Sequence, residues 1–422
     1  MARGRLGRGA LLAGRVSAAA GLRFPPLRYH GETSERGAGT RYRELGRTGL
    51  RVSEIGFGGE WMDGTPQEAR AVVEAADAAG VNILDCWMPD PTRRSNLGDA
   101  LLDLGLRERW VIQGHLGSTW QGGQYVRTRE LSAVKPAFED LLARFHTDYM
   151  DLGMIHYVDR VDDFEAVMSG PFIDYVRELR ASGTVRHVGL STHNPEVARL
   201  AVLDPEVEMI LFSVNPAFDM MPATDDLEAY FDERGESAAM DGMTPERAEL
   251  YALAEETGTG ITVMKGYMGG RLFDAAQSPF GVALTPVQCL HYALTRPAVA
   301  SVMVGFSAPG HVAEAVSYEG ASAAEKDYAS VLAGAPRHAY LGSCTYCGHC
   351  APCPKGIDIA SVNKFFDLAS AYDEVPDSLR EHYRALGATA EACIACRACE
   401  GRCPFGVRVA ERMAAAAELF GC

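Results

Sequence analysis

Short apolar runs alternate with longer amphipathic stretches along residues 41–334. An apolar run bounded by turn residues is typical of a buried strand, whereas apolar residues repeated every three or four positions are typical of a helix packed on one face. Eight runs predict strands, over residues 52–57, 81–85, 110–114, 150–156, 185–191, 209–215, 261–265 and 299–304. This alternation predicts an α/β fold, and eight βα units in a segment of this length predict a (β/α)8 TIM barrel.

Helices are expected between these strands, over residues 67–79, 132–145, 171–181, 245–256 and 286–294. Two of them follow a Thr-Pro pair, Thr65-Pro66 and Thr285-Pro286. Threonine is a good N-cap and proline a good first helical residue, so these pairs predict helix starts. Residues 216–243 are rich in Asp, Glu and Gly and too long for a minimal connection, which predicts a long loop over one face of the barrel.

The two ends of the chain differ from the barrel segment. Residues 1–31 contain six arginines and no acidic residue, a composition shared by transit peptides, disordered extensions and wrongly assigned start codons. Residues 341–422 hold two cysteine clusters separated by a largely helical spacer. We therefore predict an N-terminal extension over residues 1–40, a barrel over 41–335 and a small, mainly helical domain over 341–422.

Composition and charge narrow the class of protein. The net charge of -16 gives no support for a nucleic-acid partner, because such partners are bound through basic surfaces. We find no run of 18 apolar residues free of charge, so no membrane span is predicted. Nine of the eleven cysteines lie between Cys344 and Cys422. Tight clusters of this kind fit metal ligation in a reducing compartment, which predicts a cytoplasmic protein.

The C-terminal cysteines carry the most specific motif. The run Cys393-Ile-Ala-Cys396-Arg-Ala-Cys399-Glu-Gly-Arg-Cys403-Pro404 has the CxxCxxCxxxCP spacing of bacterial ferredoxins. A second run, Cys344-Thr-Tyr-Cys347-Gly-His-Cys350-Ala-Pro-Cys353-Pro354, has one residue fewer before its last cysteine. Together the two runs resemble a ferredoxin module with two [4Fe-4S] clusters.

The ligands of each cluster follow from that resemblance, in which the last cysteine of each run serves the other cluster. One cluster would be held by Cys344, Cys347, Cys350 and Cys403, and the other by Cys393, Cys396, Cys399 and Cys353. Structural zinc is the alternative, since CxxC pairs also bind zinc.

Polar residues follow the predicted strands of the barrel: Asp85, His115, His156, the run Ser191-Thr192-His193-Asn194, Asn215 and Lys265. The carboxyl ends of the strands meet at one rim of such a barrel, where its active sites form. A single buried polar residue is commonly structural, whereas a set of them at one rim predicts a site.

Four segments connect the barrel to a known family: residues 42–58, Gly80-Val-Asn-Ile-Leu-Asp85, Asp148-Tyr-Met-Asp-Leu-Gly-Met-Ile-His156 and Gly183-Thr-Val-Arg-His-Val-Gly-Leu-Ser191. In these segments the chain resembles the aldo/keto reductase superfamily, barrel enzymes that reduce carbonyls with NADPH. With the cysteine module, the whole chain resembles the iron-sulfur subgroup of that superfamily.

The resemblance implies a catalytic tetrad of Asp, Tyr, Lys and His, of which this chain keeps two members. Asp85 and His156 stand at the Asp and His positions, whereas Asp90 replaces the Tyr and His115 replaces the Lys. We hypothesise that His115 and His156 flank the reacting group, with one as general acid and Asp85 or Asp90 setting its protonation. Arg93 would hold an anionic substrate. The alternative is a pocket that has lost reductase chemistry.

For a nicotinamide cofactor, NAD(P)H, the predicted binding residues are Ser191, Asn215, Lys265 and Gly305. Gly305 begins the loop that binds the adenosine phosphate in the family. No Lys or Arg occurs over residues 298–325, so the 2′-phosphate of NADPH lacks its expected partner. NADH, or electrons entering through the clusters, are the alternatives.

The predicted function is an iron-sulfur oxidoreductase that transfers electrons or hydride between a nicotinamide or ferredoxin-type donor and a small carbonyl-like substrate. One alternative is an electron-transfer or docking protein, whose acidic net charge favours a redox partner with a basic face. The other is a metal-dependent hydrolase or lyase, with His115, His156, His193, Asp85 and Lys265 around a divalent ion.

Overall fold

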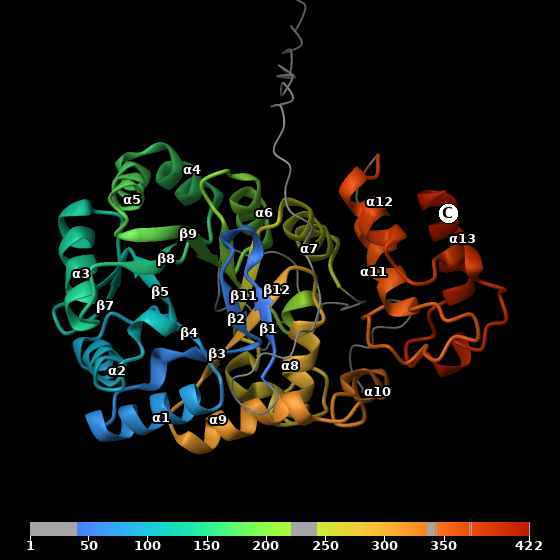
Figure 1. Cartoon of the computed structure of the whole chain (residues 1–422), viewed down its shortest axis with the longest axis horizontal. Coiled ribbons are helices and arrows are strands. Elements are labelled where there is room, and N and C mark those ends of the chain that lie inside the picture. Colours follow the sequence, from blue (N-terminus) through green and yellow to red (C-terminus); the bar gives the residue numbers. More distant parts are fainter. Residues whose placement is uncertain are drawn as a thin grey trace, which may run out of the picture. The chain divides into compact units, whose positions relative to one another are not determined.

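The computed structural model describes residues 40–220, 243–335, 342, 344–370, 372 and 374–421. Eight parallel strands form a closed barrel in which each strand pairs with the next along the chain (Figure 1). They are β3 (Ile55–Gly58), β4 (Ile83–Cys86), β5 (Val111–Leu116), β8 (Met150–Ile155), β9 (Val185–Thr192), β10 (Met209–Ser213), β11 (Gly260–Met264) and β12 (Val299–Gly305). The predicted barrel is confirmed, and each predicted strand overlaps one of these eight.

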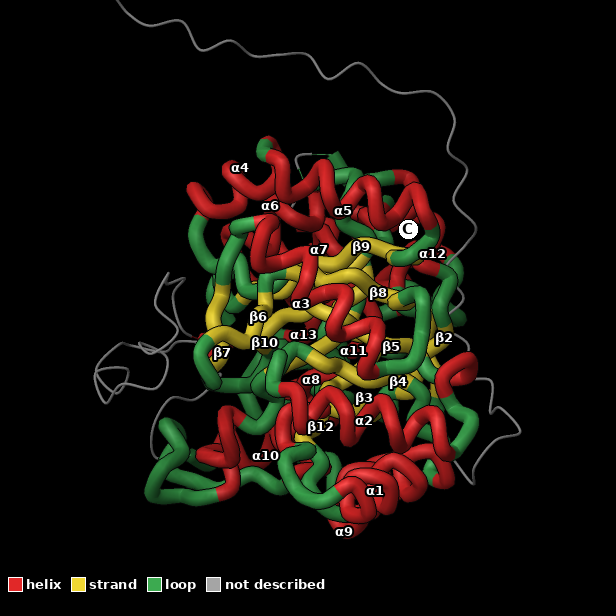
Figure 2. Tube along the Cα trace, turned by 90° about the vertical axis from the view of Figure 1, so that its left-hand side faces the viewer, coloured by secondary structure: helices red, strands yellow, loops and turns green. Residues whose placement is uncertain are grey.

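Helices surround the barrel strands, as Figure 2 shows in red around yellow. They are α1 (Pro66–Ala78), α2 (Pro91–Asp103), α3 (Leu131–Arg144), α4 (Val161–Ser169), α5 (Pro171–Ser182), α6 (Pro195–Leu203), α7 (Pro245–Thr257), α8 (Pro286–Leu294), α9 (Pro309–Val316) and α10 (Tyr328–Ala333). The five predicted helices are present, with ends within one residue of those predicted. Thr65 and Thr285 each form a capping box, with Glu68 and Gln288 respectively.

The first predicted strand is in fact two strands. Its beginning is β2 (Arg51–Ser53), which pairs antiparallel with β1 (Tyr42–Glu44) in a separate hairpin. The barrel strand β3 starts after the buried Glu54, whose carboxylate accepts a hydrogen bond from Arg43 at 2.7 Å. Glu54 lies between the two strands, and its side chain is bound by the hairpin. The chain therefore passes at this residue from the β1–β2 hairpin to the barrel sheet.

A second hairpin, which the sequence analysis did not predict, follows the third barrel strand. It consists of β6 (Ser118–Gln121) and β7 (Gln124–Arg127), joined by Gly122 and Gly123. Both glycines have positive φ, 59° and 81°, as a tight two-residue hairpin turn requires. Gly117 precedes it with φ 96°, and a Cβ there would lie 3.0 Å from the carbonyl oxygen of Thr128, so this bend also requires glycine.

Apolar side chains fill the barrel below its rim, among them Ile83, Leu152, Met154, Met209 and Leu211. The long loop predicted over residues 216–243 lies outside the described residues for 221–242. Its described beginning contains the 3-10 helix η4 (Phe218–Met220).

The cysteine-rich end of the chain is mainly helical, as predicted. Its elements are α11 (Ile359–Ser370), α12 (Asp377–Arg384), the 3-10 helices η9 (Ala390–Ala392) and η10 (Glu400–Arg402), and α13 (Val409–Phe420). No disulfide joins the ten cysteines in the described part of the chain. Within the described residues, no helix has both the length and the apolar character needed to cross a membrane.

Candidate active site and cysteine cavities

A cavity of about 610 Å³, here the mouth cavity, lies at the carboxyl ends of the barrel strands. Its lining combines titratable groups, aromatic rings and glycine backbone. The side chains that bear on its chemistry are Glu60, Trp61, Asp85, Trp87, His115, Tyr125, His156, Tyr157, Ser191, His193, Lys265 and Tyr267. Its volume is within the range of small-molecule sites in proteins.

Four of these side chains form one continuous chain of hydrogen bonds, the relay. The Asp85 Oδ1 atom lies 2.9 Å from Nε2 of His115, and Nδ1 of His115 lies 2.8 Å from Nδ1 of His156. The Nε2 atom of His156 lies 2.8 Å from the hydroxyl of Tyr125. The relay therefore connects a buried carboxyl group to a phenol at the mouth cavity.

The barrel strands position three members of the relay. Asp85 lies on β4 and His115 on the neighbouring β5, while His156 directly follows β8. Gln113 donates from Nε2 to Asp85 at 2.8 Å, and its own carbonyl accepts a hydrogen bond from Thr262 at 2.9 Å. The Gln113 side chain therefore links Asp85 on β4 to Thr262 on β11 across the barrel.

The protonation of the relay follows from its burial. Burial lowers the pKa of His156 well below its ordinary value, and the charges of His115 and of Arg129 and Arg127 lower it further. Burial raises the pKa of Tyr125 to about 12. At neutral pH His156 is therefore neutral and Tyr125 protonated. The direct contact between the two imidazoles also requires one of the facing nitrogens to carry no proton.

Other charged and aromatic groups surround the relay. The indole of Trp87 is stacked on the ring of His156, with 5.9 Å between ring centroids. Burial raises the pKa of Glu60, whereas the nearby Lys265 and a hydrogen bond from Trp87 lower it. The backbone of Lys265 is held with φ 59°, in the region that few side chains other than glycine adopt.

Most of the predicted site residues lie together. Asp85, His115, His156, Ser191, Lys265 and Gly305 line the mouth cavity. Asn215 is fully buried and bonds backbone groups, donating to the carbonyl of Lys265 at 2.9 Å and accepting from the amides of Ala217 and Phe218. It therefore supports the wall of the cavity and does not line it.

Asp90 and Arg93 do not join this group. Asp90 is the N-cap of α2 and accepts a hydrogen bond from the amide of Arg93 at 3.0 Å. The guanidinium of Arg93 binds Asp63 at 2.9 Å. Neither residue is among those that line the mouth cavity, so Asp90 is removed from our catalytic hypothesis and Arg93 from substrate binding.

The sequence analysis missed Tyr125, Glu60 and Trp87. Tyr125 lies on the β6–β7 hairpin, and the sequence signal for that hairpin was present in Gly122-Gly123, a pair typical of two-residue turns. Glu60 and Trp87 lie just after barrel strands, where polar and aromatic side chains reach the rim.

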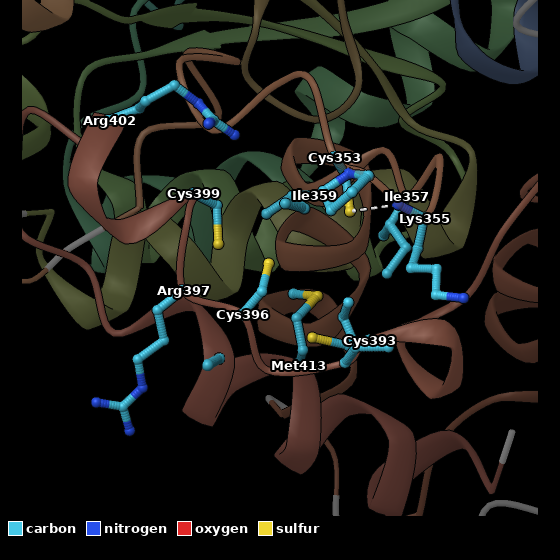
Figure 3. Close-up of a pocket in the computed structure, with 13 residues that line it drawn as sticks. Cys353, Lys355, Ile357, Ile359, Cys393, Cys396, Arg397, Cys399, Arg402 and Met413 are labelled. Carbon is cyan, nitrogen blue, oxygen red and sulfur yellow. Dashed lines mark hydrogen bonds between the residues drawn. The ribbon is translucent and has the colours of Figure 1, made fainter.

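The eight cysteines of the two motifs line two small cavities. Cys344, Cys347, Cys350 and Cys403 line the first cysteine cavity. Cys353, Cys393, Cys396 and Cys399 line the second, and Figure 3 shows their sulfur atoms facing a common space. Each cavity therefore takes three cysteines from one motif and one from the other, the grouping expected from the ferredoxin resemblance.

The two motifs are also joined by a direct contact. The guanidinium of Arg402, from the second motif, donates to the carbonyl of Cys350 at 2.5 Å and to that of Pro352 at 2.8 Å. Across the described residues, no three His, Cys, Asp or Glu side chains converge as ligands of a single metal ion. Four sulfurs spread around a hollow fit a cluster of several atoms better than one zinc ion.

Comparison with known proteins identifies both parts of the chain. Residues 54–228 match the aldo/keto reductase family and residues 343–408 match the 4Fe-4S dicluster domain. The uncharacterized oxidoreductase YqkF of Bacillus subtilis is 26% identical over 279 residues, which cover 63% of this chain and 87% of the relative. The 6-dehydroglucose reductase of Novosphingobium aromaticivorans is 27% identical over 220 residues, 48% of this chain and 66% of the relative.

Solved structures show the same fold. The holo form of the aldo-keto reductase AKR11C1 from Bacillus halodurans has a TM-score of 0.53 at 22% identity, covering 68% of this chain and 93% of that chain. The fold and these matches define an oxidoreductase built on a (β/α)8 barrel. More particularly, residues 54–228 match an aldo/keto reductase domain and residues 343–408 match a 4Fe-4S dicluster domain, so both predicted resemblances are confirmed.

Proposed function

We propose that the protein interconverts a small carbonyl compound and its alcohol in the mouth cavity, exchanging electrons or hydride with a nicotinamide or a ferredoxin-type donor. The observation that carries this proposal is the relay of Asp85, His115, His156 and Tyr125, which opens into the cavity. Carbonyl reduction and alcohol oxidation both require proton exchange at the substrate oxygen, and a hydrogen-bonded chain of titratable groups supports such exchange.

The mouth cavity suits the ring of a nicotinamide better than the phosphates of the cofactor. Among the described lining residues, Lys265 is the only lysine or arginine, whereas a 2′-phosphate is usually bound by arginine or by several cations. We therefore favour NADH over NADPH, with Ser191, Lys265 and Gly305 as the residues that would contact it. When bound, the nicotinamide supplies the hydride.

The cysteine cavities support two [4Fe-4S] clusters with the crossed ligand sets. Cys344, Cys347, Cys350 and Cys403 would hold one cluster, and Cys353, Cys393, Cys396 and Cys399 the other. When bound, the clusters supply one-electron transfer. Thiolate ligation of this kind requires a reducing compartment, which supports the predicted cytoplasmic location.

We expect a redox partner protein to dock at the rim of the second cysteine cavity. Ile394, on its rim, has 58% of its surface exposed, and the side chain of Arg397 is 67% exposed. Lys355, Arg397 and Arg402 line this cavity, and no acidic residue is among its described lining (Figure 3). We therefore expect a partner with an acidic surface at this rim, whereas the net charge of the whole chain favoured a basic one.

An anaerobic titration of the cluster-loaded protein with NADH and then NADPH tests the nicotinamide pathway. We expect NADH to bleach the iron-sulfur absorbance while the nicotinamide band falls, and NADPH to do so only at higher concentration. Lys265→Met should raise the NADH concentration required, whereas Lys135→Met, a change on the exposed surface of α3, should not.

Two results would redirect the proposal. If dithionite reduces the clusters but neither nucleotide does, the nicotinamide donor is wrong and a reduced ferredoxin takes its place in the assay. If a panel of carbonyl compounds fails to reoxidise the reduced protein, the carbonyl substrate is wrong. The panel should begin with oxidised sugars, because one relative is a 6-dehydroglucose reductase.

A further inference from the structure

Neither imidazole of the relay has a ring nitrogen left for a substrate. Nδ1 of His115 contacts His156 and its Nε2 contacts Asp85, while Nδ1 of His156 contacts His115 and its Nε2 contacts Tyr125. An imidazole has two ring nitrogens, so all four are occupied. A substrate oxygen cannot bind either histidine unless the relay is broken, which argues against His115 or His156 as the direct general acid.

Tyr125 keeps the capacity that the histidines lack. A phenol oxygen can donate one hydrogen bond and accept two, and the contact with His156 uses one of these. The side chain is half-buried and lines the mouth cavity. Its ring packs edge-on against Trp87 and His156, with centroids 5.4 Å and 5.7 Å apart. These contacts hold the hydroxyl between the relay and the cavity.

The hairpin that carries Tyr125 is attached to the strand end that carries His156. Arg127, at the end of β7, donates to the carbonyl of Tyr157 at 2.8 Å. Arg129 donates to the carbonyls of His156 and Tyr157 at 2.8 Å and 3.1 Å, and forms an ion pair with Asp163 at 2.8 Å. The distance between the phenol and the imidazole is therefore fixed by the backbone as well as by their own hydrogen bond.

We propose that Tyr125 is the catalytic residue that exchanges a proton with the substrate oxygen, and that His156, His115 and Asp85 act through it as positioning residues. This inference rests on the proposed carbonyl–alcohol interconversion. The phenol would then come from the β6–β7 hairpin, because this chain has Asp90 at the position of the family's tyrosine.

The proton step balances along the relay. In the reducing direction the carbonyl carbon gains a hydride from a nicotinamide donor, and the O–H bond of Tyr125 breaks as its proton passes to the carbonyl oxygen. The phenol oxygen regains a proton from Nε2 of His156, Nδ1 of His156 from Nδ1 of His115, and Nε2 of His115 from the carboxyl of Asp85. One proton leaves Asp85 and one appears on the product hydroxyl.

The same distances serve both directions, because the relay has two forms that differ by one proton. With Asp85 protonated, each donor points toward the cavity and the hydroxyl of Tyr125 is free to donate to a carbonyl. With Asp85 ionised, each donor points toward Asp85, and the oxygen of Tyr125 is free to accept a proton from an alcohol. His156 is neutral in both forms, as its burial favours.

The first test is the Tyr125→Phe variant, which keeps the ring and removes the hydroxyl. We expect kcat for carbonyl reduction and alcohol oxidation to fall by roughly 100- to 10,000-fold, the usual contribution of a general acid or base, with little change in KM. Gln124→Ala, at the exposed neighbouring position of β7, controls for damage to the hairpin and should keep parental kcat. Full turnover by Tyr125→Phe would overturn the proposal.

A second test separates proton transfer from a structural role. Replacing Tyr125 with a fluorinated tyrosine lowers the pKa of the phenol while preserving its shape. The alkaline limb of the pH profile of kcat/KM should then move to lower pH; an unmoved limb contradicts the proposal.

A third test needs no turnover. In 15N-histidine-labelled resting protein, Tyr125→Phe should change the tautomer signals of His156 and His115, and Gln124→Ala should not. If the parental protein turns over no carbonyl compound, the proposed function is wrong. If the histidine signals are unchanged in Tyr125→Phe, the hydrogen-bonded relay is wrong, whatever the result of the activity assay.

Discussion

At the scale of single residues, burial lowers the pKa of two histidines of the barrel and keeps both neutral at neutral pH. His156 lies at the mouth cavity, within the relay. His291 lies on α8, with Nδ1 3.2 Å from the hydroxyl of Tyr318. Burial, together with the nearby charges of Lys326 and Arg296, lowers the pKa of His291 to about 4. A histidine that is neutral when folded and protonated when unfolded makes stability depend on pH.

His291 should therefore make the protein labile to mild acid. Between pH 6.5, near the ordinary pKa, and the folded pKa of about 4, the unfolded chain binds a proton that the folded chain does not. Stability then falls with pH by up to about 1.4 kcal/mol per unit for each such histidine. The thermal midpoint, measured anaerobically from pH 7.5 to 5.0, should fall less steeply in His291→Gln than in the parent.

The exposed His311 provides the matched control, since His311→Gln should keep the parental slope. Equal slopes for the His291 variant and the parent would contradict this account.

Some site residues could be predicted from the sequence and others could not. Asp85, His115 and His156 were predictable because each follows a recognisable apolar run, and such strand ends converge in a barrel. Asp90 misled because an aspartate before proline can equally cap a helix, which is its position in the structure. Asn215 was predicted to bind the cofactor, but its side chain forms hydrogen bonds with the backbone of Lys265 and Ala217. Only the fold shows that this side chain lies behind the wall of the cavity.

At the scale of elements, the barrel was predictable and its additions were not. Long apolar runs with good caps determine the eight strands and the helices between them. The β6–β7 hairpin was missed because its strands are short, partly exposed and mixed in polarity, so periodicity gives no signal there. The Gly122-Gly123 turn was the signal available.

A buried ionic network joins the connection after β10 to two helices. The carboxylate of Asp219, fully buried, accepts hydrogen bonds at 2.7 Å from Tyr251 on α7 and from Tyr292 on α8. It also pairs at 3.2 Å with Arg247, which is fully buried as well. Asp219 therefore fastens the start of a long connection to the outer helices.

Removing the Asp219 carboxylate should lower the free energy of unfolding. Asp219→Ala would remove the carboxylate that pairs with the buried Arg247 and accepts hydrogen bonds from Tyr251 and Tyr292, and breaking a buried ion pair by removing one member typically costs about 3–5 kcal/mol of unfolding free energy. The loss is measurable by denaturant or thermal unfolding of the cluster-loaded protein. Asp219→Ala combined with Arg247→Met should recover part of it. A loss below about 1 kcal/mol in the single variant would show that the pair contributes little.

At the scale of the whole molecule, the two cysteine motifs are interlocked. Cys353 ends the first motif but lines the second cysteine cavity, and Cys403 ends the second motif but lines the first. Arg402 links the motifs directly. Only the resemblance to ferredoxins predicted this crossing. The spacing within one motif does not show which cavity its last cysteine lines.

Paired substitutions test the crossed ligand sets. Cys353→Ala with Cys393→Ala removes two ligands from one cavity, and should lower the iron content from about eight to about four atoms per chain. Cys350→Ala with Cys353→Ala removes one ligand from each cavity and should impair both clusters. The opposite pattern would mean that each motif binds its own cluster, and zinc in place of iron would mean a structural metal site.

The β6–β7 hairpin lies between a barrel strand and a helix, outside the repeating βα units. It is therefore an insertion in the loop after β5, although its arginines fasten it to the strand end that carries His156. For protein engineering, residues 117–129 would have to be transplanted together, because the bend at Gly117 and the contacts of Arg129 hold the hairpin at the rim. A suitable recipient barrel would already have two histidines that lead from the carboxylate to the rim.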